Sequence, residues 1–368
     1  MQTQFNYYSD GPTHEYLDIS CTNMDIDGNN PFPLLRIKDD RQQAIINNPK
    51  DYYISIVKFE ITTARCLPLM IPEVKLGQNN PNLLNYKIGL IKIADDTNYM
   101  QDVIFSPNDL AVPVPVDIPT NNKDLVNPYY YIYTFQQFIR MLNVALFDSA
   151  TTAGLATYPY FVYDVNSGLL SLYVPTSYAN VYYIAVDNNL AVILDGFQML
   201  YNKRVSSTLT VNEILTHYFG NGINEITIDG VTFFKMEQER SSLGIINAVR
   251  GIEFAVNLLN VNPTMIQPTQ VFGDNIKVDE SGNNAKIAAI LSDFSITIAP
   301  NNLYLPNIGY TPSAEYRLFD MVSDIPQAHI MFDLYWKDKF GVMNPLKLAP
   351  GCSCNIKVMF RKKNFNGV

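Results

Sequence analysis

Short runs of β-branched and aromatic residues recur along the chain, and turn residues separate them. The clearest run, Tyr52–Thr63, is followed by Pro68 and Pro72. Such runs are typical of β-strands, whereas a helix shows apolar residues at intervals of three and four. About twelve strands can be drawn in this way, and they do not alternate with helices as in a parallel α/β fold. The sequence therefore predicts an all-β protein, a sandwich or jelly roll.

One segment departs from this pattern and predicts a substantial helix. Thr134 and Gln137 form the Thr-x-x-Gln signature of a capping box at a helix N-terminus. Apolar residues follow at helical spacing, and we interpret this stripe as core packing rather than a ligand site. The stripe consists of Phe135, Phe138, Ile139, Leu142 and Leu146. The residues before it, Tyr129–Tyr133, are predicted to form a strand.

Turn signals predict two hairpins, and other segments are expected to be irregular. The hairpins are Tyr160–Tyr163 with Leu169–Val174, and Glu225–Ile228 with Val231–Phe234, the second turning at Asp229-Gly230. The first fifty residues and the proline-rich stretch Pro107–Pro128 are expected to be loops or arms that reach neighbouring subunits. Thr210–His217 is predicted to be a short helix that ends at Gly220.

Composition excludes several classes of protein. The chain has 368 residues, and 35 acidic against 26 basic side chains give a net charge of −9. This balance argues against broad coating of nucleic acid, which requires clustered Lys and Arg. Apolar residues make up 47%, enough for a full core. No apolar run is long enough to span a membrane, and Met1–Tyr8 does not resemble a secretory signal.

The cysteines and histidines do not predict a metal site. Cys21, Cys66, Cys352 and Cys354 match no zinc spacing, and the histidines are His14, His217 and His329. We expect free structural thiols in a protein made in a reducing compartment, with a disulfide formed after release as the alternative. The acidic stretch Asp25–Asn30 is interpreted as a turn, because a calcium loop needs more oxygen ligands at regular offsets.

Motifs for catalysis are absent from the sequence, and no catalytic, cofactor-binding or metal residue is predicted. His217 is interpreted as a polar helix end rather than a base. Asp333 and Asp338 bracket Trp336, which could indicate a glycosidase, but Asp333 is expected to form a salt bridge and Asp338 to lie in a turn. The cluster Arg361, Lys362 and Lys363 is interpreted as a solvated tail, with weak contact to packaged DNA as the alternative.

Three stretches resemble a known family. Asn48–Phe59 is similar to the first core strand of the penton, or minor capsid, proteins of polinton-type DNA viruses, a group that includes adintoviruses and, more distantly, virophages. Tyr130–Leu146 is similar to their strand-then-helix segment. The closing strands correspond to Phe332–Asp338, followed by 345–348 and 360–363.

The resemblance implies a jelly-roll subunit that assembles as a homo-pentamer at the vertices of an icosahedral shell, beside neighbouring major capsid proteins. It implies a virion protein made in the host cytoplasm or nucleus, and it carries over no catalytic residue. Residues 201–289 show little of the resemblance and are expected to be an inserted second β region. Residues 1–200 with 290–368 would form the jelly-roll core with an N-terminal arm.

Two other functions fit the same composition. A major capsid subunit would contain two jelly rolls and form trimers. A sugar-binding β-sandwich would present Tyr and Trp faces to pyranose rings, with a cleft near Trp336. A sugar-binding protein is expected to be a monomer or small oligomer, whereas a penton subunit should form five-fold rings.

Overall fold

The computed structural model describes residues 14–24, 35–62, 65–110, 112–115, 128–216, 224–256, 261, 271–272, 277–278, 289–295, 307–311, 317–338 and 343–363. These residues form two compact units. Unit 1 comprises residues 1–67, 249–296 and 305–368, and unit 2 comprises residues 68–248 and 297–304. Unit 2 is therefore an insertion in the sequence of unit 1.

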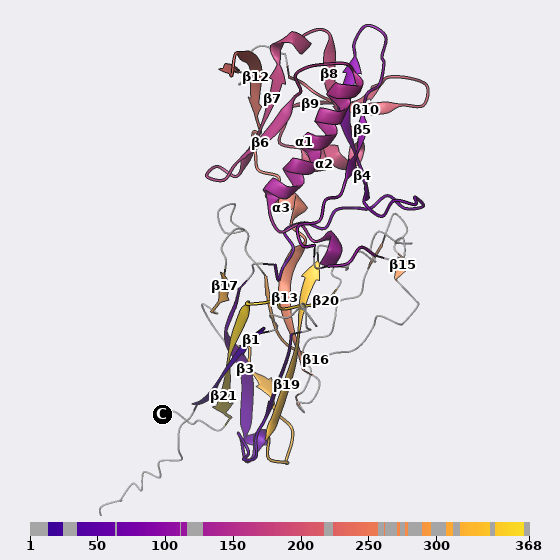
Figure 1. Ribbon diagram of the computed structural model, residues 1–368. Coiled ribbons are helices and arrows are strands. Elements are labelled where there is room, and N and C mark those ends of the chain that lie inside the picture. Colours follow the sequence, from indigo (N-terminus) through magenta and orange to yellow (C-terminus); the bar gives the residue numbers. More distant parts are fainter. Residues whose placement is uncertain are drawn as a thin grey trace, which may run out of the picture. The chain divides into compact units, whose positions relative to one another are not determined.

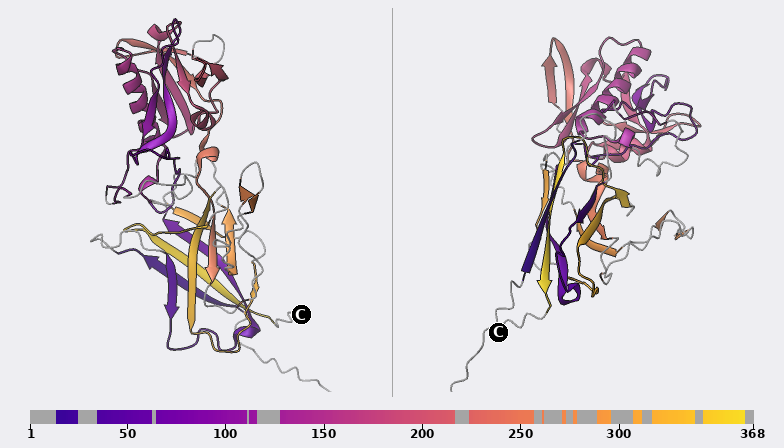
Figure 2. Two further views of the ribbon diagram at one scale, coloured as in Figure 1. Left: turned by 90° about the vertical axis from the view of Figure 1, so that its right-hand side faces the viewer. Right: turned by 60° about the horizontal axis from the view of Figure 1, so that its bottom comes forward.

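Unit 1 is built from two antiparallel sheets (Figures 1 and 2). The first sheet has the order β1-β21-β3-β17, with β18 also paired to β3, and the second has the order β16-β13-β19-β2, with β20 also paired to β19. The strands of the first sheet are β1 (His14–Thr22), β21 (Ser353–Lys362), β3 (Tyr52–Thr62), β17 (Asn307–Tyr310) and β18 (Phe319–Asp320). Those of the second are β16 (Ala289–Ser295), β13 (Val249–Val256), β19 (His329–Asp338), β2 (Arg36–Asp40) and β20 (Met343–Pro345). A short ribbon, β14 (Val271–Phe272) with β15 (Lys277–Val278), and a 3-10 turn, η1 (Pro49–Asp51), complete the unit.

The pairing in unit 1 is that of a jelly roll. With β17 and β18 counted as two parts of one strand, the first strand pairs with the eighth and the second with the seventh. The third pairs with the sixth, and the fourth with the fifth. This is the wrapped antiparallel arrangement found in viral capsid domains. Unit 2 is inserted between the third strand, β3, and the fourth, β13.

A β-bulge in β3 explains how its apolar residues all reach the core. Lys58 pairs with Lys357 and Ile56 with Val358, so Val57 is an extra residue in the strand. The bulge resets the alternation of side chains, and Ile54 and Ile56 before it face the same side as Phe59 and Ile61 after it. Phe59 then contacts Phe254 and Phe294 of the second sheet, with ring centroids 5.2 and 5.3 Å apart.

Unit 2 contains two further sheets, one large hydrophobic core cluster and a smaller cluster of Ile91, Tyr183, Ala185 and Val211. Their orders are β5-β4-β8-β10-β9 and β11-β12-β7-β6. The strands are β4 (Leu83–Lys92), β5 (Gln101–Ile104), β6 (Tyr160–Asp164), β7 (Leu169–Pro175), β8 (Tyr182–Val186), β9 (Met199–Arg204), β10 (Thr210–Ile214), β11 (Asn224–Ile228) and β12 (Val231–Glu237). The helices are α1 (Phe135–Thr152), α2 (Asn188–Ile193) and α3 (Leu243–Ile246), with 3-10 turns η2 (Pro128–Tyr130) and η3 (Thr176–Tyr178).

Helix α1 packs closely on β4 because one strand residue has no side chain. A Cβ atom on Gly89 would lie 2.6 Å from the Cα of Met100 and 2.8 Å from the Oγ of Ser149. The same serine, buried in α1, accepts a hydrogen bond of 2.9 Å from the backbone N–H of Leu90. The predicted apolar stripe of α1 is confirmed, since all five of its residues are buried in the core of unit 2.

The predicted capping box forms only in part. Thr134 is the N-cap, and its hydroxyl accepts a bond of 3.3 Å from the N–H of Gln137. The side chain of Gln137 does not return the bond but donates instead to the carbonyl of Ser106, at 2.9 Å. The side-chain amide of Gln137 therefore binds the loop that contains Ser106 instead of the N-terminus of its own helix.

Three expectations about local structure were wrong. Tyr129–Tyr133 is not a strand but holds the end of η2 and a single bridge from Ile132 to Met70. Thr210–Ile214 is strand β10, because its buried Val211 and Ile214 lie between β8 and β9. The first fifty residues contain β1 and β2, whose partners β21 and β19 lie near the other end of the chain. Asp25–Asn30 lies outside the described residues.

The units are divided differently from the segments expected on the sequence. The expected boundary after residue 200 falls inside unit 2, and the expected insertion, 201–289, is shared between both units. The physical reason is the large core cluster of unit 2. It includes residues of β4, α1, β6 and β7, all before residue 200, together with Ile214 and Met236 after it.

Candidate assembly surfaces

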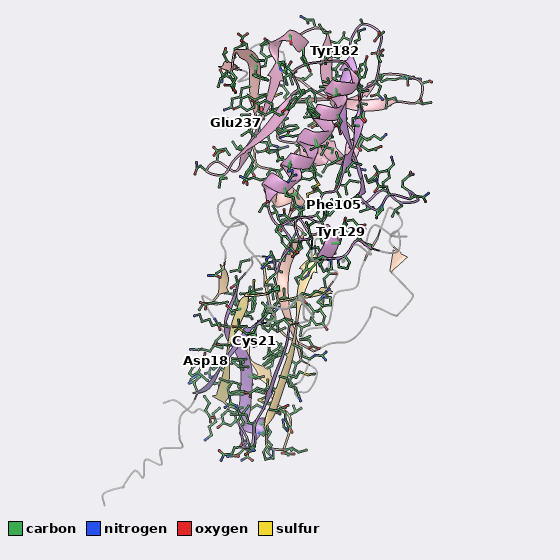
Figure 3. The ribbon with its side chains drawn as sticks, in the orientation of Figure 1. Asp18, Cys21, Phe105, Tyr129, Tyr182 and Glu237 are labelled. Atoms are coloured by element: carbon green, nitrogen blue, oxygen red, sulfur yellow. The ribbon has the colours of Figure 1, made fainter. Side chains whose placement is uncertain are left out.

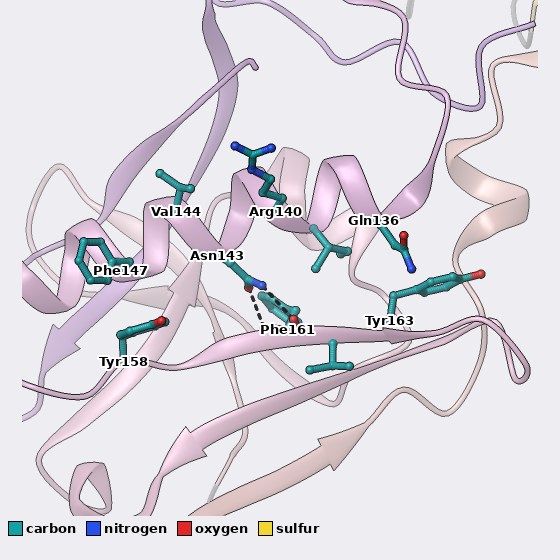
Figure 4. Close-up of a pocket in the computed structure, with 10 residues that line it drawn as sticks. Gln136, Arg140, Asn143, Val144, Phe147, Tyr158, Phe161 and Tyr163 are labelled. Atoms are coloured by element: carbon teal, nitrogen blue, oxygen red, sulfur yellow. Dashed lines mark hydrogen bonds between the residues drawn. The ribbon is translucent and has the colours of Figure 1, made fainter. Parts of the chain in front are cut away.

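The groove between α1 and the edge strand β6 is the candidate site in unit 2 (Figure 4). It has a volume of about 480 Å³. Its wall includes exposed apolar side chains, with Phe147 48% and Tyr158 41% exposed. The lining residues are Gln136, Ile139, Arg140, Asn143, Val144, Phe147, Tyr158, Phe161, Val162 and Tyr163. Arg140 gives the groove a positive charge at its rim.

Asn143 at the floor of the groove binds the edge of β6. Its side-chain carbonyl accepts a hydrogen bond of 2.7 Å from the N–H of Phe161, and its amide donates one of 2.9 Å to the carbonyl of Phe161. Figure 4 shows both bonds. A primary amide used in this way replaces the peptide group of a neighbouring strand, so the edge of β6 is closed at this point.

Aromatic rings continue from the groove across the sheet. Phe147 contacts Tyr158 at 5.1 Å, and Tyr158 contacts Tyr160 at 6.4 Å. Tyr160 stacks on Tyr173 of β7 at 5.1 Å and meets Phe233 of β12 edge-on at 5.5 Å. Burial, followed by the neighbouring hydroxyl of Tyr173, raises the pKa of Tyr160. We call these five residues the aromatic row. Exposed aromatic side chains are typical of surfaces that become buried on association.

Strand β1 is the candidate surface of unit 1, because it is an edge strand nine residues long. Its exposed side chains include Tyr16, 59% exposed, and Asp18, which lies 3.4 Å from Lys357. Edge strands present backbone groups that can pair with another chain. By contrast, the edge strand β2 is short and carries four charged residues, a composition that discourages such pairing.

The structure separates the acidic pair that bracketed Trp336. Asp333 and Asp338 are five residues apart in β19, so their side chains lie on opposite faces of the strand. Asp333 accepts two hydrogen bonds from Arg36, at 2.6 and 3.0 Å, which confirms the expected salt bridge. The bond and charge of Asp333 raise the pKa of Arg36. Asp338 is the last residue of β19 rather than part of a turn.

Trp336 lies in the core of unit 1 and is 1% exposed. A ring that stacks on a sugar must be open to solvent on one face, so the expectation of a sugar-binding cleft at Trp336 was wrong. The alternation of β19 explains this burial, because Phe332 and Leu334 point to the same side as Trp336 and are buried as well.

The two histidines within the described residues have different partners. His329 begins β19, and its Nδ1 lies 2.9 Å from the carboxylate of Asp40 in the neighbouring strand β2. His14 stacks on Tyr16 in β1. His217 lies outside the described residues. No cluster of metal-ligating side chains occurs in the described part of the chain, and no helix there could cross a membrane.

The basic cluster closes β21. Arg361 is exposed and stands in register with Tyr53 of β3 and His14 of β1. Lys363 donates to the carbonyl of Met321 at 3.0 Å and forms an ion pair of 3.1 Å with Asp320. Lys363 is therefore partly neutralised by its own unit, which reduces the charge that the cluster offers to a polyanion.

The eight-stranded jelly roll of unit 1 is a common fold of viral capsid subunits. The family model described as Sputnik minor capsid protein V18/19 matches residues 15–362, and the chain belongs to this family. It is thus a minor capsid protein and a component of a virion, and it belongs among structural proteins rather than enzymes.

Individual relatives agree with this assignment. The chain is 33% identical to the uncharacterized protein V18 of Sputnik virophage over 32% of its length and 74% of that protein. It is 28% identical to the structural protein V19 of the same virophage over 36% of its length and 58% of that protein.

Solved structures resemble the whole chain. A chain from the cryo-EM structure of the Sputnik virophage matches with a TM-score of 0.74 and 25% identity, over 97% of this chain and 100% of that one. The crystal structure of the mavirus penton protein matches with a TM-score of 0.62 and 13% identity, over 95% of this chain and 99% of that one. The second likeness concerns the fold alone.

Sequence reasoning did not find the groove. It assigned α1 to the core from its buried stripe and gave no role to the opposite face. The signal was present in Val144 and Phe147, which interrupt the polar face of the predicted helix. The partners of this face, Tyr158 and β6, follow only from the fold.

Proposed function

We propose that the chain forms homo-pentamers at the vertices of an icosahedral capsid, where each pentamer contacts neighbouring major capsid proteins. The observation that carries the proposal is the jelly roll of unit 1 with unit 2 inserted between its third and fourth strands. The fold likeness to the crystal structure of the mavirus penton protein, which extends over 95% of this chain and 99% of that one, supports the proposal. A five-fold ring is a heterologous interface that closes on itself, so each subunit contributes two different surfaces.

Native mass measurement of the purified full chain tests the pentamer. The expected species has five times the mass of one 41.7 kDa chain, and negative-stain images should show five-fold rings. A trimer would instead support the major capsid alternative. A monomer that persists at high protein concentration would contradict both assignments.

We further infer that a second copy of the chain covers the aromatic row in the pentamer. Phe147 and Tyr158 of the row are exposed beside the positively charged Arg140, and the whole chain has a net charge of −9, so an acidic surface of a neighbouring copy is a complementary partner. The variant Phe147→Ser with Tyr158→Ser should lose the pentamer and keep its circular dichroism spectrum. Tyr201→Ser is the matched control, because Tyr201 is 51% exposed and lies in β9, outside the groove. A pentamer that survives the double substitution would contradict this part of the proposal.

We also propose that Arg361, Lys362 and Lys363 make a weak contact with packaged DNA. Replacement of Arg361 and Lys362 by Ala should lower the affinity for duplex DNA. The slope of the logarithm of the binding constant against the logarithm of salt concentration should become shallower by about 2. An unchanged slope would assign the cluster to the solvated surface. We also propose synthesis in the reducing host cytoplasm or nucleus, which the four free thiols support.

A further inference from the structure

All four cysteines of the chain lie in unit 1, at one end of its first sheet. Cys21 is the penultimate residue of β1, and Figure 3 labels it there. Cys354 is the second residue of β21, and Cys352 comes directly before that strand. Cys66 follows the end of β3 by four residues. Since β21 lies between β1 and β3 in the sheet, the four thiols lie in or directly beside the neighbouring ends of three adjacent strands.

Cys21 and Cys354 are direct partners across the β1–β21 ladder. Opposed residues of antiparallel strands have Cα atoms about 4.5 or 5.5 Å apart. Both separations fall within the range of about 4.4–6.8 Å that disulfides require. Cys354 is fully buried, whereas Cys21 is half-buried and gives a reagent access to the pair.

Cys66 and Cys352 form a second pair around Ala349. The N–H of Ala349 donates to the sulfur of Cys66 at 3.4 Å, and its carbonyl accepts from the N–H of Cys352 at 3.0 Å. The two thiols are themselves hydrogen-bonded. This bond, together with burial, raises the pKa of Cys66. The same bond and the nearby charge of Arg65 outweigh burial at Cys352 and lower its pKa to about 7. The thiol of Cys352 is therefore the more acidic of the two and the one that acts first as a nucleophile.

We propose that oxidation joins these residues in two disulfides, Cys66–Cys352 and Cys21–Cys354, which fasten β1, β21 and the segment after β3 to one another. The setting for this step rests on the proposed function, because a protein on a released virion leaves the reducing cell for an oxidising medium. The pairing itself rests on the strand register and the contacts of Ala349.

The oxidant is a small disulfide such as oxidised glutathione. The thiolate of Cys352 attacks one sulfur of the reagent, whose S–S bond breaks and releases one glutathione thiolate. Cys66 then loses its proton to solvent, and its sulfur displaces the second glutathione from Cys352. Cys21 and Cys354 react in the same way, with Cys21 attacking first. The formation of each protein disulfide removes two hydrogen atoms from a pair of thiols and reduces one oxidised glutathione to two glutathione thiols.

The Cys66–Cys352 bond would close a loop that contains the whole of unit 2. In the chain-entropy account, a disulfide stabilises mainly by restricting the unfolded chain, and longer loops give larger effects. Oxidation is thus expected to raise the melting temperature of unit 1 and to slow proteolysis at the ends of β1 and β21.

The test compares the full chain before and after incubation with oxidised glutathione. We expect peptide mass spectrometry without reduction to find the two linked pairs and a thiol assay in denaturant to find no free cysteine. Cys66→Ser should retain only the Cys21–Cys354 link and carry a glutathione adduct on Cys352. Cys21→Ser is the matched variant and should retain only the Cys66–Cys352 link. Both variants should melt below the oxidised wild type.

A folded, oxidised chain that keeps four free thiols would overturn the proposal, and so would links between other pairs or between chains. Native mass measurement of the reduced protein keeps this outcome separate from the proposed function. A reduced pentamer without cross-links would contradict the disulfides alone, whereas an intramolecularly cross-linked monomer would contradict the pentamer alone.

Discussion

The two units reach a similar β architecture through different kinds of contact. In unit 1, β1 at residues 14–22 pairs with β21 at residues 353–361, and β2 pairs with β19, so most ladders join distant parts of the chain. In unit 2, β6 pairs with β7 and β11 with β12 across short turns. Local ladders need little loop closure, whereas distant ones require the intervening chain to be ordered first. Unit 1 should therefore be the more sensitive unit to errors of register.

Deletion of Val57 is expected to give the largest difference in stability between the two units. Without the bulge residue, either Phe59 and Ile61 or Ile54 and Ile56 must turn away from the core of unit 1. We expect unit 1 to lose its folded structure and the ladders of unit 2 to persist. Hydrogen exchange of β21 against β7 checks this. Val57→Ala, which keeps the register, is the control and should leave both ladders protected. Equal loss of protection in β7 would contradict the comparison.

Gly89→Ala tests the packing of α1 in unit 2. The added methyl would meet backbone at 2.6 Å and displace Ser149 from its bond to Leu90. We expect a loss of about 1–3 kcal/mol in the free energy of unfolding, measured by denaturant titration. Gly244→Ala is the matched control, because a Cβ atom there has no neighbour within 4 Å. An equal effect of both substitutions would show that the close approach at Gly89 is not responsible.

Asn143→Ala tests whether the β6–β7 ladder depends on the side chain of Asn143. The change removes both bonds to Phe161 and leaves its backbone groups without these partners. We expect a cost of about 1–3 kcal/mol and faster hydrogen exchange at Phe161. Gln136→Ala, on the same face of α1, should leave this exchange rate unchanged. If hydrogen exchange at Phe161 is as slow in the Asn143 variant as in the wild type, β6 stays folded without the side-chain amide of Asn143.

Substitution of Asp187 is expected to have the smallest effect on the free energy of unfolding, and this effect should depend on pH. Its carboxylate caps α2 by accepting from the N–H of Leu190 at 2.9 Å, and burial raises its pKa. A raised pKa means that the stability from this group is full below its unfolded pKa of about 4 and is lost as pH rises through the folded value. Asp187→Asn keeps the cap and should be at least as stable as the wild type at pH 7, with no advantage in acid.

The control at this position is Asp187→Ala, which loses the cap. It should cost about 1 kcal/mol, as N-cap replacements usually do. Denaturant titrations at pH 3.5 and pH 7 distinguish the two substitutions. An advantage of the Asn variant that grows in acid would contradict the sign of the pKa shift.

Two hairpins that pair locally could be predicted from the sequence, whereas some strands that pair with distant parts of the chain could not. Both predicted hairpins form, and Asp229 and Gly230 both have positive φ, as their turn requires. Such signals are local. Strands β1 and β2 were missed because their polar, alternating residues form strands only against β21 and β19. Thr210–Ile214 was taken for a helix because its neighbours in space, β8 and β9, could not be seen in the sequence.

The surfaces were harder to predict than the fold. The aromatic row combines residues from α1, β6, β7 and β12, and no spacing in the sequence connects Phe147 with Phe233. The buried tryptophan shows the opposite error. A single Trp between two acids suggested a binding platform, but the alternation of β19 places it in the core. Side-chain chemistry alone did not reveal which face of an element meets solvent.

The pairing of the first strand with the last has a consequence during translation. β1 at residues 14–22 leaves the ribosome long before its partner β21 at residues 353–362 has been made. Ribosomes add about 5–20 residues per second, and domains tend to fold as they emerge. Unit 2 can therefore fold while β1 is still unpaired, and the first sheet of unit 1 is completed only after β21 has been synthesised.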